Sequence, residues 1–248
     1  ATDSEVVLDL CGRRLKRLEK APANQAFASA LVLDNNQLQN LANLDSYGEL
    51  ERLSIASNQI VRMYWFARMY SLRILNLPNN NIANIEGMRE LAHVIHLNLA
   101  GNHLKSIEGL SYNSKLEHLN LAGNYITHIN DLSMLKSLRE LFLHRNRLGS
   151  LYRCSKYLPS SLIILTLSDN NVSDLNDLSN LSQLNNLEQF TILNNPALEP
   201  LQPTDEGGNP VGPLLAFDYR PYVINWCLNL KVLDGYKVTP KERTPSLS

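Results

Sequence analysis

The chain has 248 residues, of which 44% are hydrophobic and 19% charged, and its formal net charge is -1. That length is ample for a well-buried core, and by itself it would fit one large domain or two small ones. A nucleic-acid-binding protein usually carries a strong basic excess, because neutralised phosphates supply most of its affinity. The balanced charge therefore argues against nucleic acid as a partner.

The cysteines and the apolar runs indicate the compartment. Cys11, Cys154 and Cys227 lie far apart, and no pair has CxxC spacing. This spacing gives no support to a zinc or thioredoxin-like site, and it favours a reducing compartment, the cytosol or the nucleus. The first residues, ATDSEVVLDL, contain neither a basic segment nor a long apolar run, and no stretch is long enough to span a bilayer. We therefore expect no membrane partner.

Residues 1–27 contain the first, imperfect copy of a pattern that returns along the chain. The segment EVVLDLCGRRL, from Glu5, approximates the template LxxLxLxxNxL, with Arg13 at the position of the asparagine. A stacked repeat needs its terminal copy to close the core. We interpret residues 1–27 as a degenerate first repeat that acts as the N-terminal cap.

Residues 28–198 follow the template closely. Its asparagine recurs at Asn36, Asn58, Asn80, Asn102, Asn124, Asn146, Asn170 and Asn195. Neighbouring members are 22 residues apart five times, and then 24 and 25. A buried amide can both donate and accept hydrogen bonds, so this column predicts an asparagine ladder that bonds the backbone of successive turns.

The period predicts a leucine-rich-repeat solenoid of the α/β class. Each copy supplies one short strand whose alternate leucines point inward, and nine such strands stack into a parallel concave sheet. A 22-residue repeat leaves room on the convex side only for a 3₁₀ segment or a single helical turn.

The convex return path has apolar columns of its own. The first column is Leu41, Met63, Ile85, Ile107, Ile129, Leu151 and Leu175. The second is Leu44, Phe66, Met88, Leu110, Leu132, Cys154 and Leu178. We expect both columns in the core, with Cys154 acting as a small apolar side chain.

The C-terminal quarter predicts a loop and then a cap. Residues 199–216 are rich in Pro and Gly and read as a surface loop. Residues 217–240 predict an aromatic helix, with apolar residues at helical spacing, followed by the half-repeat LKVLDG. The expected helix face is Tyr222, Trp226 and Leu230, and the expected lids on the last coil are Phe217, Tyr219, Trp226 and Leu233. Residues 241–248 read as a tail.

Side chains between the inward leucines should line the concave sheet, the usual binding face of such a solenoid. Phe142 lies between the core residues Leu141 and Leu143, so strand alternation turns it toward that face. An exposed aromatic beside histidine and arginine has the composition of a binding hot spot, although a solitary exposed aromatic is also common. The candidate protein-binding residues are Arg52, His96, His118, Glu140, Phe142, His144 and Arg145.

Two further features have more than one interpretation. Tyr64 and Trp65 stand on the return path, where the other repeats have polar residues or Gly, and they form either a second contact surface or a local packing unit with Tyr70. His96, His118 and Glu140 fall on adjacent strands and could be written as a zinc site, but a polar ladder on a flat sheet is commoner. No GxSxG motif is present, so we expect no catalysis and no cofactor.

Two segments carry a resemblance to one family. RILNLPNNNIANIEGMRELAHVIHLNLAGNHLK and the tail FDYRPYVINWCLNLKVLDGY are similar to the N-terminal repeat domain of the family of the centrosomal protein of ninety-seven kilodaltons. The similarity extends from about Val6 to Pro240. The repeats are shared with phosphatase regulators and with spliceosomal and axonemal proteins, whereas the NLPxN segment and the tail are more specific.

The resemblance implies a scaffold at the distal end of the centriole, in the cytoplasm. It implies a partnership with the centriolar coiled-coil protein of one hundred and ten kilodaltons, a restraint on microtubule elongation and cilium formation, and contact with microtubule-associated centriolar proteins. The family supplies no set of contact residues, so the concave-face candidates come from the template alone. The alternative is a phosphatase-regulator-like adaptor, which shares the repeat period.

Overall fold

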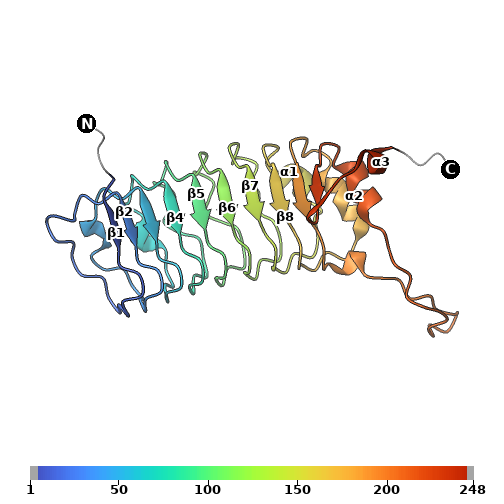
Figure 1. The fold of residues 1–248 in the computed structure, drawn as a ribbon, viewed down its shortest axis with the longest axis horizontal. Helices are drawn as coiled ribbons and strands as arrows, with labels where there is room; N and C mark the ends of the chain where they lie inside the picture. The colour runs from blue at the N-terminus through green and yellow to red at the C-terminus, as the bar shows by residue number, and fades with distance from the viewer. Residues whose placement is uncertain (1–4, 245–248) are drawn as a thin grey trace.

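The computed structural model describes residues 5–244, and in it the repeats stack into one solenoid with a continuous sheet (Figure 1). The sheet has eleven strands in chain order, parallel throughout except for the last pair. The strands are β1 Val7–Asp9, β2 Ala30–Val32, β3 Arg52–Ser54, β4 Ile74–Asn76, β5 His96–Asn98, β6 His118–Asn120, β7 Glu140–Phe142, β8 Ile164–Thr166, β9 Gln189–Thr191, β10 Val232–Leu233 and β11 Tyr236–Lys237. The predicted leucine-rich-repeat solenoid is confirmed.

The strand register follows from the alternation of side chains. Leu53 pairs with Leu75, and Leu75 with Leu97, so the central residue of each strand always meets its counterpart in the next coil. All three leucines are buried. A slip of one residue would turn this buried row to the solvent, which is why the register is uniform along the sheet.

The asparagine ladder has the predicted double role. Asn102 Oδ1 accepts the backbone N–H of Ile82 at 3.0 Å, while Nδ2 donates to the carbonyls of Leu77 and Leu99, both at 3.0 Å. The ladder asparagines are buried, except for Asn170, which is half-buried. Because each amide bonds two coils, the ladder fixes the stacking of the repeats.

The residue before each ladder asparagine turns the chain out of the strand. Asn79, Gly101, Gly123 and Arg145 all have positive φ, at 58°, 66°, 67° and 57°. Gly and Asn enter this left-handed region at little cost, whereas Arg145 enters it against its intrinsic preference. The repeated LAGN sequence is therefore a turn, as its position predicts.

The convex side carries only short helical pieces, as the repeat length requires. These are η1 Leu44–Ser46, η2 Tyr64–Phe66, α1 Cys154–Tyr157, η3 Leu175–Leu181 and η4 Pro196–Leu198. Both predicted apolar columns of the return path are buried, except that Leu175 is only partly buried against the core. Cys154 is 2% exposed, and burial raises the pKa of its thiol to about 12, so it packs as an apolar side chain.

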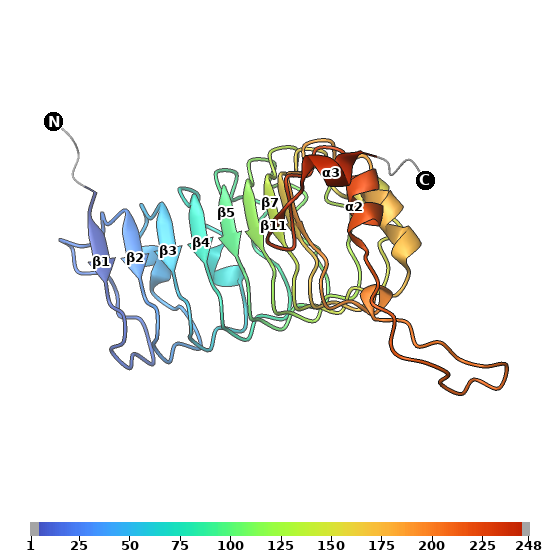
Figure 2. The same cartoon turned by 45° about the vertical axis from the view of Figure 1, so that its right-hand side comes forward.

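The C-terminal end differs from the repeats in its elements. Residues 199–216 form an exposed loop that extends away from the solenoid, and two isolated antiparallel bridges hold it (Figure 2). Helix α2, Arg220–Trp226, then crosses the last coil, with Val223 and Ile224 buried. Trp226 is 39% exposed and Tyr222 is 51% exposed. The expectation that Trp226 is a lid on the last coil is therefore wrong.

Trp226 is exposed because another face of α2 packs on the last coil. Its inward face is formed by Val223, Ile224 and Cys227, which precede the buried Leu230 and Leu233. Aliphatic side chains and a thiol fill the narrow space over the last coil, and the two large rings stay at the surface. Phe217 is half-buried, and its ring lies 5.7 Å from that of Tyr222.

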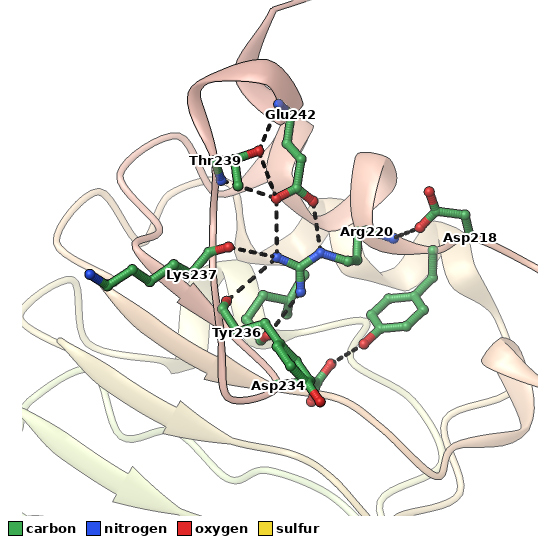
Figure 3. Close-up of polar contacts among 9 residues, drawn as sticks. Asp218, Arg220, Asp234, Tyr236, Lys237, Thr239 and Glu242 are labelled. Carbon is green, nitrogen blue, oxygen red and sulfur yellow. Dashed lines mark hydrogen bonds and ion pairs between the residues drawn. The ribbon is translucent and has the colours of Figure 1, made fainter.

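Arg220 ties the elements of this end together (Figure 3). Its Nε donates to Glu242 at 2.7 Å, and its Nη1 and Nη2 donate to the carbonyls of Leu233 at 2.9 Å and Lys237 at 3.3 Å. The same guanidinium therefore contacts β10, β11 and the helix α3, Pro240–Arg243. This network holds the C-terminal segment on the solenoid.

A second contact, between Tyr219 and Asp234, joins the cap to the last coil. The Tyr219 hydroxyl donates to Asp234, and the Asp234 carboxylate also accepts the N–H groups of Ile192 at 2.8 Å and Leu193 at 3.1 Å. Burial, reinforced by the hydrogen bond to Asp234, raises the pKa of Tyr219. Tyr219 thus joins the cap to the end of β9.

The interpretation of residues 241–248 as a tail is wrong for residues 241–243. Thr239 and Glu242 form a capping box that starts α3, and Arg243 donates to the carbonyls of Ile224 at 3.0 Å and Cys227 at 3.2 Å. These bonds satisfy the carbonyl end of α2. Residues 245–248 lie outside the described residues. Within the described chain, no helix has the length and apolar character needed to cross a membrane.

Candidate protein-binding surface

The concave face consists of two rows of side chains that stand between the buried leucines. The first row pairs across the sheet in register, and so does the second, two residues further along each strand. The first row is Arg52, Ile74, His96, His118, Glu140, Ile164 and Gln189, and the second is Ser54, Asn76, Asn98, Asn120, Phe142, Thr166 and Thr191. All are half-buried except Gln189, which is exposed, so the two rows form one accessible surface.

Three of the predicted residues meet at the middle of this face. The rings of His96 and His118 are 5.7 Å apart, and His118 Nδ1 lies 2.6 Å from Glu140 Oε2. They stand on the neighbouring strands β5, β6 and β7 because the repeat places the same template position at the same depth. The sheet therefore carries a linear polar ladder.

The surroundings of His96 keep its imidazole neutral. Burial lowers the pKa of His96, and the nearby His118 lowers it further, while Glu140 acts in the opposite direction. His96 is therefore neutral at neutral pH and offers one donor and one acceptor to a partner. A partner that meets this face encounters the neutral imidazole of His96 beside the contacting pair His118 and Glu140.

The ladder does not close around a metal. Within residues 5–244, no group of three or more His, Cys, Asp or Glu side chains comes together in a way that could hold an ion. His118 directs one ring nitrogen to Glu140 instead, so the two residues contact each other rather than a shared centre.

Phe142 lies beside the ladder, as its position in the strand predicts. It is half-buried and meets the ring of His144 edge to face at 6.3 Å. His144 Nδ1 lies 2.8 Å from Thr166 Oγ1 on β8, which fixes the imidazole against the aromatic ring. Burial lowers the pKa of His144, with Arg145 acting in the same direction and Asp169 against it. This arrangement presents a rigid aromatic edge next to a neutral imidazole.

The two predicted arginines differ in how close they lie to this cluster. Arg145 is exposed at the rim, where its backbone turns with a φ of 57°. Arg52 lies near the N-terminal end of the sheet and forms an ion pair with Glu5. Arg145 directly follows His144 and so adjoins the Phe142 cluster. Arg52 is on β3, three strands away from His118 on β6.

The face also contains features that the candidate set omitted. Ile74 and Ile164 are apolar members of the first row, on either side of the polar ladder. Ile74 and Arg52 contribute to a shallow hollow of about 360 Å³ at the N-terminal half of the face. The template identified both isoleucines as concave, but aliphatic residues in a leucine-rich sequence carry no signal that separates contact from packing.

Asparagine side chains of the second row hold the backbone that follows each strand. Asn98 Oδ1 accepts the N–H of Ala100 at 2.9 Å, and Asn120 Oδ1 accepts the N–H of Ala122 at 3.0 Å. These bonds hold the ends of β5 and β6 in place, so the middle of the concave surface is rigid. A rigid surface loses little conformational entropy on binding.

Tyr64 and Trp65 belong to the convex side. Tyr64 is 47% exposed, Trp65 is partly buried against the core, and their rings are 4.6 Å apart. The Arg62 guanidinium lies 5.0 Å from the Tyr64 ring and is itself paired with Glu86 at 2.6 Å. Trp65 therefore has a packing role, and Tyr64 is the member of the pair that faces solvent.

Comparison with known families agrees with this architecture. The leucine rich repeat family model matches residues 48–104 and 93–148. Among solved structures, an internalin, InlF, from Listeria monocytogenes superposes with a TM-score of 0.68 over 92% of this chain and 60% of its own, at 22% identity. Internalin C2 from the same organism gives a TM-score of 0.63 over 75% of this chain and 80% of its own, at 21% identity. At these identities the likeness concerns the fold alone.

Curated relatives are closer in sequence. The chain is 44% identical over 99 residues to the centrosomal protein of 97 kDa of Homo sapiens, and 43% identical over 100 residues to that of Mus musculus. The Xenopus laevis protein is 44% identical over 93 residues. The two mammalian matches each cover 40% of this chain but only 10% of the relative. The resemblance to the leucine-rich-repeat domain of the centrosomal protein of 97 kDa is thereby confirmed over about 40% of this chain, a shorter span than the expected Val6 to Pro240.

Proposed function

From the likeness to the centrosomal protein of 97 kDa, we propose that this chain is a protein-interaction domain of a centrosomal scaffold, and that it binds its partner on the concave sheet. The observation that carries the proposal is the cluster of Phe142, His144, His118 and Glu140 on one rigid, accessible face. Aromatic side chains held by their neighbours supply much of the binding energy in protein interfaces.

The chemistry of the face favours binding over catalysis. His118 directs Nδ1 to the Glu140 carboxylate, and His144 directs Nδ1 to the Thr166 hydroxyl. Neither of these contacts pairs a histidine with a Ser or Cys side chain that could act as a nucleophile. The two thiols at the convex and C-terminal ends, Cys154 and Cys227, are buried, with pKa values raised to about 12 and about 11. A thiol is a good nucleophile only as thiolate, so these residues support packing.

The proposed location is the distal end of the centriole, and the proposed partner is the centriolar coiled-coil protein of one hundred and ten kilodaltons. Support comes from the identity of the curated relatives and from the tail sequence FDYRPYVINWCLNL. In that setting the domain restrains elongation of centriolar microtubules and formation of the cilium, together with other microtubule-associated centriolar proteins. A helix of such a coiled-coil partner would lie across the concave sheet, between Ile74 and Ile164.

A pull-down with the purified chain tests the binding surface. Phe142→Ala and Arg145→Glu should each reduce recovery of the coiled-coil partner, whereas Tyr152→Ala, at a side chain 73% exposed on the return path, should leave it unchanged. Undiminished recovery with both concave variants would place the site elsewhere. Recovery of a phosphatase catalytic subunit in place of the coiled-coil protein would favour an adaptor of a different class.

A further inference from the structure

A cluster of cationic and aromatic side chains lies outside the concave sheet, on the edge where the chain leaves the asparagine ladder. His103, Tyr125 and Arg147 directly follow the ladder residues of three successive coils. The Arg147 guanidinium lies 4.6 Å from the centre of the Tyr125 ring, and the His103 ring lies 6.0 Å from it on the other side. The three side chains therefore form one row, in which Arg147 lies over the Tyr125 ring and the His103 ring is tilted against it by 54°.

The stack borders an open hollow of about 410 Å³. Lys105 and Thr127 complete its lining. The hollow is therefore lined by two cations, Lys105 and Arg147, and one imidazole, and by no carboxylate. Within the described residues, neither Lys105 nor Arg147 takes part in an ion pair. Their positive charge is therefore unneutralised by the protein.

The corresponding stack at the convex side shows the difference. Arg62 lies over the Tyr64 ring, but its guanidinium is bonded by Glu86 at 2.6 Å and 3.0 Å. That arginine is satisfied within the chain, and this bond raises the pKa of Arg62 and lowers that of Glu86. Arg147 has the same stacking geometry without the internal carboxylate.

The backbone under the hollow is fixed by regular bonds between coils. The N–H groups of His103, Tyr125 and Arg147 each donate to the preceding coil, in all three cases at 2.8 Å. Successive coils are about 4.8 Å apart, so the coil of Lys105 and the coil of Arg147 are separated by roughly 10 Å. Lys105 and Arg147 therefore stand on the two coils that flank the coil of Tyr125.

We propose that this hollow binds an acidic, extended segment of a partner protein, with two carboxylates on Lys105 and Arg147 and the two intervening residues against Tyr125. A polyproline II segment places residues i and i+3 on one face about 9 Å apart, which matches the separation of the two coils. Aromatic grooves bind such segments because they are already extended and lose little entropy. The sequence class is Glu-x-x-Glu, with proline between the acids.

This site is independent of the concave surface. Arg145 at the rim is two residues from Arg147, so one partner could cover both, but none of the lining residues belongs to the concave rows. The sequence contained one signal for it, the succession His, Tyr, Arg at the same template position. That position is polar and variable in the repeat, and only the structure reveals the stack and the hollow.

Nuclear magnetic resonance titration of the ¹⁵N-labelled chain tests the proposal. The probe is the peptide GPEPPEPG, and its control is GPQPPQPG, which has the same backbone without the charges. The glutamate peptide should shift the amide signals of residues 103, 125 and 147, and the glutamine peptide should not. No shifts at millimolar peptide, equal shifts with both peptides, or shifts confined to other residues would each overturn the proposal.

Charge-reversal variants distinguish binding in this hollow from non-specific attraction of the acidic peptide to other basic residues. Lys105→Glu combined with Arg147→Glu should weaken the affinity for the glutamate peptide about tenfold or more, because two attractive exposed contacts become repulsive. Arg89→Glu is the matched control, since Arg89 also stacks on a tyrosine, Tyr112, at 4.7 Å, outside the hollow. Equal weakening by this control, or tighter binding of a twelve-nucleotide single-stranded RNA at the same amides, would contradict the proposal. Phe142→Ala should leave peptide binding intact, so either surface can fail without the other.

Discussion

His118 and Glu140 stand on adjacent strands with Nδ1 and Oε2 2.6 Å apart, at the centre of the concave face. Their side chains are 36% and 31% exposed, so solvent reaches the pair from the side on which a partner would arrive. A contact of this kind orients both groups for an incoming chain while contributing little to the fold.

The pair should therefore be nearly neutral for stability. A double-mutant cycle with His118→Ala, Glu140→Ala and the combined variant should give a coupling free energy below about 1 kcal/mol, as for other exposed pairs. Urea denaturation measures it, and the same variants should lose partner binding. A coupling of several kcal/mol would show that the pair is structural.

The asparagine ladder should dominate the stability of each coil. Asn102→Leu leaves the N–H of Ile82 without an acceptor inside the core. It also removes one of the two amide donors to the carbonyls of Leu77 and Leu99, which keep their bonds from Asn80 and Asn124. One unsatisfied buried group costs about 1–3 kcal/mol, so the free energy of unfolding should fall by about that amount. Urea denaturation checks this. Asn81→Leu, the same change at an exposed neighbour, is the control, and an equal free energy of unfolding in the two variants would refute the ladder.

Gly109 should tolerate no side chain. Its φ is +91°, and a Cβ built there would lie 2.5 Å from the carbonyl oxygen of Ile85 in the preceding coil. Gly109→Ala should lower the free energy of unfolding by about 1–3 kcal/mol, because strain of this type has that cost. Gly149→Ala is the matched control, since its Cβ would meet nothing within 4 Å. Thermal unfolding of both variants decides the question, and equal stability would contradict the close approach of the coils.

The C-terminal network should make the free energy of unfolding depend on pH in the acid range. Hydrogen bonds from Arg220, and then from Thr239, lower the pKa of Glu242 from 4.5 to about 2. A depressed carboxyl pKa stabilises the fold above 4.5, and this contribution is lost as the pH falls from 4.5 toward 2. The free energy of unfolding of the native chain should therefore fall further over this range than that of Glu242→Gln. Parallel loss in the two proteins would mean that Glu242 is not linked to folding.

Sequence alone predicted the parts of the fold that the repeat dictates. Leu97 and Asn102 recur at fixed template positions, so their burial and their bonding follow from the period. Phe142 reached the concave face for the same reason. Residues whose environment comes from a neighbouring coil, such as Arg147 on Tyr125, could not be placed in this way.

The C-terminal end was predicted least well because it has no repeat. Trp226 has helical spacing with Leu230, yet the narrower Val223 and Ile224 fill the end of the core. Which face of an isolated helix is buried depends on the shape of the surface beneath it, and periodicity does not contain that shape. Arg243, which bonds the carbonyl end of α2, lay in a segment that resembles a linker in composition.

The concave surface can be tested most directly by site-specific photocrosslinking. A benzophenone amino acid at Ile74, on the concave sheet, should capture the coiled-coil partner when the complex is irradiated. The same amino acid at Tyr152, which is exposed on the return path, should capture none. Crosslinks at position 152 without crosslinks at position 74 would show that the partner binds the other side of the solenoid.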